Sequence, residues 1–161
     1  MPKITYLKGD ATEPIHDRAV ICHVCNDIGG WGRGFVLALS KKWPEPEREY
    51  RKWSKDPSLF EDAPFGLGQT LFVPVKDDQQ IIVANMVAQR DTITVNDIPP
   101  IRYDALENCL KDVFAVCQKL GWTLQAPMFG AGLAGGNWEK IEKIILKHIS
   151  VPMFVYQWNN K

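Results

Sequence analysis

The chain has 161 residues, of which 45% are hydrophobic and 24% charged, so we expect one globular domain with a real core and no disordered region. Its 19 basic and 19 acidic residues give a formal net charge of zero, which disfavours general nucleic-acid binding because that function needs a broad positive field. No stretch approaches the length of a membrane span, and the N-terminus lacks the apolar segment of a signal peptide, so we expect a cytoplasmic protein without a membrane partner.

The first predicted strand covers residues 4–8 and ends at Gly9-Asp10-Ala11-Thr12. Asp10 at this strand end has two possible roles. Its carboxylate either caps the following turn or accepts a hydrogen bond from an exocyclic amine such as adenine N6. Residue chemistry leaves both roles open.

The stretch 19–43 reads as a strand over 19–26, a turn, and a helix that runs from Gly34 and stops at Trp43, before Pro44. Four of the six residues from 29 to 34 are glycine. Glycines ahead of a helix let several backbone N–H groups converge on one anion without obstruction by Cβ atoms. We therefore predict a phosphate-binding loop, with a turn that needs glycine only for close packing as the alternative.

Two polar side chains stand at the end of that strand. His23 shares a strand face with Ile21 and Cys25, where a histidine is either a core residue or a catalyst. Asn26 comes directly before the glycine loop. Its amide offers both a donor and an acceptor, so it either orients the turn or hydrogen-bonds a ribose diol.

The four cysteines have to be examined as a redox or zinc motif, because Cys22 and Cys25 form a CxxC pair. In an extended strand these two side chains point to opposite faces and cannot share one metal. Cys109 and Cys117 lie eight residues apart on a predicted helix, about 12 Å along its axis, which is too far for a disulfide. We interpret all four as core or lining thiols and expect no metal site.

The middle of the chain predicts a helix from Glu45 to Lys55, and we assign its basic residues to the surface. These are Arg48, Arg51 and Lys52. Two strands, 68–75 and 81–88, then form a predicted hairpin, and the almost wholly apolar second strand fits a central position in a sheet. Residues 89–100 are either a flap over a site or only a long connection.

The strongest helix signal runs from Tyr103 to Leu120 and ends at Gly121. A strand over 123–129 leads into a second glycine-rich loop, 130–136, and Asn137 is the predicted N-cap of another helix. The last strand, 151–158, has a proline near its start, which suits an edge or an entry position. Strands alternating with helices, plus one hairpin, predict a three-layer α/β/α sandwich with a mixed central sheet and ligand loops at the strand ends.

Two glycine loops suit a diphosphate. Four or five charge-assisted hydrogen bonds of about 1.5–3 kcal/mol each, with one stacked base, reach the roughly 8 kcal/mol of micromolar binding. Residues 130–135 match the pattern GxGxxG of dinucleotide-binding folds, but that fingerprint needs an acidic residue about 20 positions further on, and the last strand has none. A Walker loop is excluded because neither loop ends in Gly-Lys-Ser or Gly-Lys-Thr.

As a set, these motifs resemble the macro domains, a family that binds ADP-ribose. The turn 9–12, the strand into Asn26, the glycine loop 29–34 and the late loop 130–133 occur in that family's order over nearly the whole chain, so we expect residues 1–161 to form a single macro domain. The segment His23-Val24-Cys25-Asn26 is similar to the His-x-Cys-Asn strand of one branch. That branch contains the fungal ADP-ribose-1″-phosphate phosphatases and the terminal ADP-ribose protein glycohydrolases.

The resemblance implies a ligand and a division of labour. The ligand is ADP-ribose or a derivative, with an ADP-ribosylated macromolecule as a further expected partner and no cofactor. Asp10 would take the adenine amine, with Ala11 in the same ligand-binding turn, and Asn26 would bind the distal ribose. The two loops would hold the diphosphate, with Trp31 and Phe129 as walls of the cleft. The binding residues expected there are Gly30, Trp31, Gly32, Arg33 and Gly34 in the first loop and Phe129, Gly130, Ala131, Gly132 and Leu133 in the second.

The resemblance also implies chemistry at the distal ribose. His23 matches a histidine implicated in the phosphatase branch, so it is the expected catalytic residue of a metal-independent hydrolase, as general acid, general base or nucleophile on a 1″-phosphate. The glycohydrolase branch uses a lysine and an aspartate at positions that fall near Met86 and Ala134, which puts that mechanism in doubt. We therefore expect a phosphatase of this type. A catalytically silent ADP-ribose reader and a glycohydrolase with a non-standard site are the alternatives.

Overall fold

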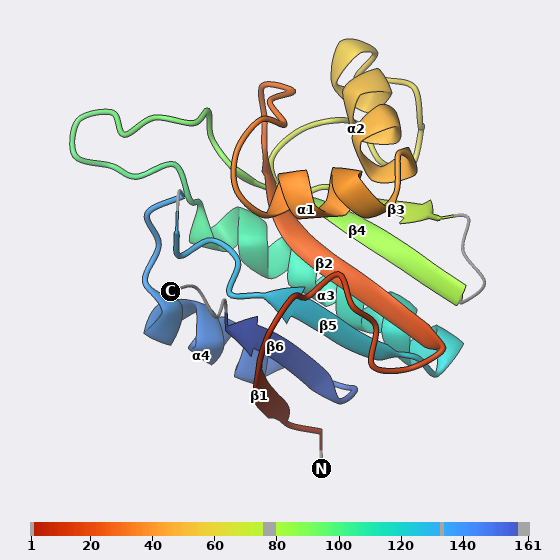
Figure 1. Cartoon of the computed structure of the whole chain (residues 1–161). Coiled ribbons are helices and arrows are strands. Elements are labelled where there is room, and N and C mark those ends of the chain that lie inside the picture. Colours follow the sequence, from red (N-terminus) through yellow and green to blue (C-terminus); the bar gives the residue numbers. More distant parts are fainter. Residues whose placement is uncertain (1, 76–79, 133, 158–161) are drawn as a thin grey trace.

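A mixed sheet of six strands lies at the centre of the computed structural model, which describes residues 2–75, 80–132 and 134–157 (Figure 1). The strands are β1 (Ile4–Lys8), β2 (Arg18–Asn26), β3 (Thr70–Pro74), β4 (Gln80–Gln89), β5 (Thr123–Pro127) and β6 (Met153–Gln157). They follow the order β1-β6-β5-β2-β4-β3. β3 and β4 pair in antiparallel fashion, as the predicted hairpin requires, and the other neighbours are parallel.

Helices cover both faces of this sheet. α1 (Phe35–Lys42) and α2 (Glu45–Lys55) lie on one face, and α3 (Tyr103–Leu120) and α4 (Trp138–His148) lie on the other (Figure 1). Each face has its own apolar core, because the side chains of β2 alternate between the two helical layers. The predicted three-layer α/β/α sandwich with a mixed sheet is thus confirmed.

The cysteines follow the same alternation. Cys22 packs with Cys109 and Cys117 in the core beneath α3, whereas Cys25 belongs to the core beneath α1 and α2. All four are buried free thiols. The interpretation of the CxxC pair as two core residues on opposite faces is confirmed.

The ends of the helices follow the predicted signals. Gly121 closes α3 in the left-handed conformation, with φ of 73°, and its N–H donates to the carbonyl of Cys117. Asn137 caps α4, since its side chain accepts a hydrogen bond from the N–H of Lys140 at 3.2 Å. α1 ends where Trp43 becomes extended, directly before Pro44.

The last strand shows one of the two positions predicted for its proline. β1 and β3 form the two edges of the sheet, and β6 lies between β1 and β5. Pro152 therefore precedes an interior strand, where its missing N–H falls just outside the ladder, and only the entry position holds. The predicted end of this strand at Trp158 lies outside the described residues.

The carboxyl ends of β2, β4 and β5 meet at one edge of the sheet, because these strands are parallel. Residues 27–34 follow β2 and residues 128–137 follow β5, so both glycine loops emerge at this edge. The segment 90–100 after β4 extends away from the sheet (Figure 1). It is tied back to the first loop by the N–H of Asp91, which donates to Oδ1 of Asp27 at 2.7 Å. None of the helices in the described ranges has the length and apolar character that crossing a membrane requires.

Candidate ligand-binding cleft

The two glycine loops border one cleft of about 540 Å³. Two polar residues at the end of β4 and just beyond it, Gln89 and Thr92, also line it, so the segment after β4 is part of the wall. Ten of the residues predicted for the site line the cleft. They are His23, Asn26, Gly30, Trp31, Gly32, Arg33, Gly34, Phe129, Gly130 and Gly132. Segments about 100 residues apart in sequence thus meet at one concave surface.

Four predicted residues are not placed in this lining. Oδ1 of Asp10 accepts hydrogen bonds from the N–H of Thr12 at 2.9 Å and from its hydroxyl at 2.8 Å, which is the capping role. Ala11 is buried, and its carbonyl accepts a hydrogen bond from Nε2 of Gln125 at 2.9 Å. Ala131 follows Gly130 without lining the cleft. Leu133 lies outside the described residues.

Asn26 holds the first loop in shape. Its Oδ1 accepts from the N–H groups of Ile28 at 3.0 Å and Gly30 at 2.9 Å, and its Nδ2 donates to the carbonyl of Gly30 at 2.9 Å. The hydroxyl of Tyr50 lies 2.7 Å from the Asn26 carbonyl oxygen and 2.8 Å from Oδ1. The structure therefore shows the turn-orienting role, and these bonds leave at most one Nδ2 hydrogen for a ribose.

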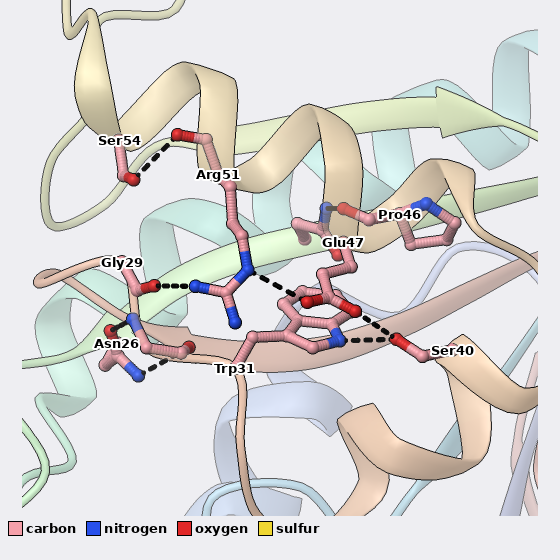
Figure 2. A network of polar contacts seen from close by, with 10 residues as sticks. Asn26, Gly29, Trp31, Ser40, Pro46, Glu47, Arg51 and Ser54 are labelled. Carbon is pink, nitrogen blue, oxygen red and sulfur yellow. Dashed lines mark hydrogen bonds and ion pairs between the residues drawn. The ribbon is translucent and has the colours of Figure 1, made fainter.

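Helix α2 braces the same loop from behind through Glu47 (Figure 2). The indole Nε1 of Trp31 donates to Oγ of Ser40 at 2.7 Å, and that hydroxyl donates to Oε1 of Glu47 at 2.8 Å. Nε of Arg51 donates to Oε2 of Glu47 at 2.9 Å, and Nη1 of Arg51 donates to the carbonyl of Gly29 at 3.2 Å. These contacts connect both ends of the segment 29–31 to one carboxylate.

Assigning the charge run of α2 to the surface is therefore incomplete, because Arg51 reaches the loop although 43% of its side chain is exposed. The hydrogen bonds from Arg51 and Ser40 lower the pKa of Glu47. A helical spacing marks this face, since Glu47, Tyr50, Arg51 and Ser54 stand at positions i, i+3, i+4 and i+7. That spacing is the sequence signal that these side chains share one face of α2.

Backbone donors without partners lie along the cleft. Six backbone N–H groups donate no hydrogen bond within the described ranges. They belong to residues 31–34, Gly130 and Gly132. The N–H of Gly30 is the exception among the predicted donors, because Asn26 already accepts from it. Added Cβ atoms at Gly32 and Gly132 would meet nothing within 4 Å, so both peptides face open space. Arg33 is exposed and forms no ion pair with any described residue. This combination of bare donors and one cation suits an anionic ligand.

His23 forms part of the cleft wall but is 2% exposed. Its ring packs against Trp31, with centroids 5.5 Å apart, and against Phe35, with centroids 5.7 Å apart. Nε2 lies 2.5 Å from Oδ1 of Asn85, whereas Nδ1 has no hydrogen-bond partner among the described residues. Burial lowers the pKa of His23 to about 4, so the imidazole is neutral at pH 7 and cannot begin a reaction as a general acid.

The sequence analysis does not single out Asn85, which is fully buried and is the only polar residue between the two terminal glutamines of β4. Met86 beside it is also fully buried and does not line the cleft, whereas Ala134 does. Among the described residues, no three His, Cys, Asp or Glu side chains are grouped so that they could hold a metal ion.

Solved structures resemble this chain over nearly its full length. A Bacteroides thetaiotaomicron protein of unknown function is 45% identical, with a TM-score of 0.89, and the match covers 97% of this chain and 98% of that one. A macrodomain protein from Streptomyces coelicolor is 39% identical, with a TM-score of 0.80, and the match covers 96% of this chain and 98% of that one.

Curated relatives divide into long and short proteins. The mouse chromodomain-helicase-DNA-binding protein 1-like is 33% identical over 164 residues, which cover 95% of this chain but 17% of the relative, so this chain spans about one-sixth of that protein. The ADP-ribose 1″-phosphate phosphatase of Candida albicans is 24% identical over 160 residues, and the match covers 95% of this chain and 98% of that one. No protein-family model matches the chain. Since the Streptomyces macrodomain matches this chain from end to end at 39% identity and shares its fold, the chain belongs to the macrodomain family.

Proposed function

We propose that this macrodomain binds ADP-ribose in the cleft between the two glycine loops. The observation that carries the proposal is the row of backbone N–H groups of residues 31–34, Gly130 and Gly132, beside the guanidinium of Arg33, none of which has a partner among the described residues. A diphosphate offers several acceptor oxygens and negative charge to such a row. The volume of about 540 Å³ lies within the usual range of small-molecule sites.

The reaction that we propose is removal of the phosphate from ADP-ribose-1″-phosphate. The likeness to the Candida albicans phosphatase supports it, together with the place of His23 in the wall near Asn26. Neutral His23 would take a proton from water as the water oxygen attacks phosphorus. The bond between phosphorus and O1″ breaks, and O1″ receives the proton, which leaves ADP-ribose and inorganic phosphate. A phosphate dianion beside the imidazole would raise the pKa of His23 from its low value in the free protein.

A reader of ADP-ribose without catalysis is the second candidate. The burial of His23 favours it, because Nδ1 has no exposed surface and Nε2 is already engaged by Asn85. A glycohydrolase with a non-standard site is less well supported, since the positions near Met86 and Ala134 carry apolar side chains. An ADP-ribosylated macromolecule as partner and a cytoplasmic location also belong to the proposal, the latter because all four thiols are free.

Alanine substitution of two glycines tests the binding proposal. Gly32→Ala and Gly132→Ala place a methyl group in the open space before the bare amides, and we expect each to weaken ADP-ribose binding at least tenfold in calorimetry. Neither glycine has a positive φ, so the fold should tolerate both changes. Gly66→Ala is the matched control, since Gly66 also has nothing within 4 Å and does not line the cleft. If the wild-type protein gives no heat of binding with ADP-ribose, the proposal is refuted.

Phosphate release separates the two candidates. Wild type that binds ADP-ribose should release phosphate from ADP-ribose-1″-phosphate if it is the hydrolase, and His23→Ala should slow that release. Tight binding with no release identifies the reader. Equal turnover by wild type and His23→Ala would remove His23 from the mechanism.

A further inference from the structure

We propose that Asn85 is a positioning residue that holds His23 in the Nε2–H tautomer and thereby keeps the lone pair of Nδ1 bare for a hydroxyl group or water in the ligand complex. His23 and Asn85 are direct cross-strand partners in the pairing of β2 with β4. The ligand half of this inference rests on the proposed function. The tautomer half rests on the geometry of the protein alone.

The orientation of the Asn85 amide is determined by helix α2. Nδ2 of Asn85 lies 3.2 Å from the carbonyl oxygen of Pro46, in the first turn of α2, and donates to it. A flipped amide would set Oδ1 against this carbonyl, so that two acceptors would face each other without a proton. Oδ1 therefore points at His23, 2.5 Å from Nε2.

The tautomer of His23 follows from this orientation. An amide oxygen only accepts, so Nε2 has to carry the hydrogen of the neutral ring, and Nδ1 is left with its lone pair. The other contacts of the ring bring no charge to it, since they come from the aromatic rings of Trp31 and Phe35 and from Sγ of Cys25, 3.8 Å from Nε2. Burial raises the pKa of the Cys25 thiol, which stays neutral.

A bare Nδ1 is costly in the free protein. A buried acceptor without a hydrogen bond is disfavoured, and most buried polar atoms in folded proteins have a partner. The unpaired Nδ1 atom belongs to His23, which lies in the wall of the cleft. A ligand hydroxyl or water that donates to Nδ1 would give this atom its missing hydrogen bond. Ligand binding would thereby remove the cost of leaving Nδ1 unpaired.

Two aromatic rings pack against the imidazole of His23. The indole of Trp31 is held by its hydrogen bond to Ser40, whereas Phe35, at the start of α1, is partly exposed. Because Nδ1 is buried in the free protein, the proposal requires one of these rings to move when the ligand binds.

Nitrogen NMR of the three histidines tests the tautomer in the ligand-free protein. We expect the His23 side chain, assigned by comparison with His23→Gln, to show a protonated Nε2 and a bare Nδ1 at pH 7. Asn85→Leu, which is similar in volume but cannot accept, should shift population to the Nδ1–H tautomer. Asn85→Asp retains the acceptor and should keep Nε2 protonated while the carboxylate raises the pKa of His23. A wild-type His23 in the Nδ1–H form overturns the proposal without any variant.

Ligand titration tests the second half. With binding established by calorimetry, saturating ADP-ribose or inorganic phosphate should shift the Nδ1 resonance of His23 in the direction of an accepted hydrogen bond. An unchanged Nδ1 resonance in the saturated protein overturns this half. Absence of any ADP-ribose binding overturns the proposed function and this half with it, while the ligand-free tautomer still decides the role of Asn85.

If the protein turns over ADP-ribose-1″-phosphate, Asn85→Leu should lower kcat by 10- to 100-fold with little change in KM, and an unchanged kcat counts against positioning.

Discussion

The side chain of Asn26 binds both backbone polar groups of Gly30, since Nδ2 donates to its carbonyl and Oδ1 accepts from its N–H, each at 2.9 Å. One amide can do both, whereas a carboxylate only accepts. Asn26→Asp would therefore lose the bond to the carbonyl and set two oxygens against each other. We expect the free energy of unfolding to fall by about 1–3 kcal/mol and ADP-ribose binding to weaken at least tenfold.

Urea unfolding and calorimetry measure these two effects. Asn108→Asp is the control, because Asn108 is exposed on α3 and outside the cleft. The same loss of affinity in both variants would mean that the added charge, and not the loop, is responsible.

Glu47 should make the loop sensitive to acid. Its pKa is lowered by Arg51 and Ser40, so its stabilising contribution is present above the pKa of a glutamate in the unfolded chain, near 4.3, and is lost as pH falls through the lower folded value. Since 34% of the side chain is exposed, we expect Glu47→Gln to remove only about 0.5–1 kcal/mol. Its effect on stability should vanish at low pH, where the wild-type carboxylate is protonated.

A second glutamate on α2 is the matched control. Glu49 pairs with Arg48 and Lys52 but has no bond to the glycine loop. Glu47→Gln should weaken ADP-ribose binding several-fold, whereas Glu49→Gln should leave it unchanged. Equal affinities for the two variants would show that the brace behind Trp31 does not govern binding.

Asp10 can be tested for its two roles separately. Asp10→Asn retains an oxygen that accepts from Thr12, so the turn should persist, whereas Asp10→Ala should lose about 0.5–1.5 kcal/mol of stability. If the carboxylate also accepts from adenine, both variants should weaken ADP-ribose about tenfold and leave ribose-5-phosphate, which has no adenine, unaffected. Calorimetry with both ligands decides, and equal losses for the two would restrict Asp10 to the cap.

Regular alternation made much of this fold predictable. The parity of β2 separates Cys22 from Cys25 and places His23 with the α1 and α2 layer, and the three-four spacing of α3 ends at a glycine in the left-handed conformation. The meeting of the two loops also followed, since the ends of parallel strands share one edge. These features depend on local periods that are visible in the residues.

The polar contacts behind the cleft were not predictable in the same way. The amide of Asn26 suits a turn or a ribose equally, and only the position of Gly30 and Tyr50 shows that the turn uses it. Arg51 looks like a solvated charge until the fold brings Gly29 within reach. Asn85 is the one polar residue among positions 81–88 of β4, and its partners come from β2 and α2, 62 and 39 positions away. Such contacts are set by tertiary packing.

His23 should give the protein a distinct dependence of stability on pH. Its pKa is about 4 in the folded protein, where burial disfavours the charged ring, against 6.5 as the ordinary value. Between these values the unfolded chain binds more protons than the native one, so stability rises with pH across the window and falls as pH drops from 6.5 toward 4. At about 1.4 kcal/mol for each pH unit, the whole effect is about 3 kcal/mol.

Substitution of His23 should flatten this dependence. His23→Gln removes the titrating ring, so its stability should change less between pH 4 and 6.5 than that of wild type, even though its stability at pH 7 is lower. His16→Gln is the control, because it also removes an imidazole, but His16 is exposed and lies outside the cleft. Urea midpoints across the window measure the slopes. Parallel curves for wild type and His23→Gln would mean that the imidazole titrates alike in the folded and unfolded chains, and that the ring is not sealed from water as the structure has it.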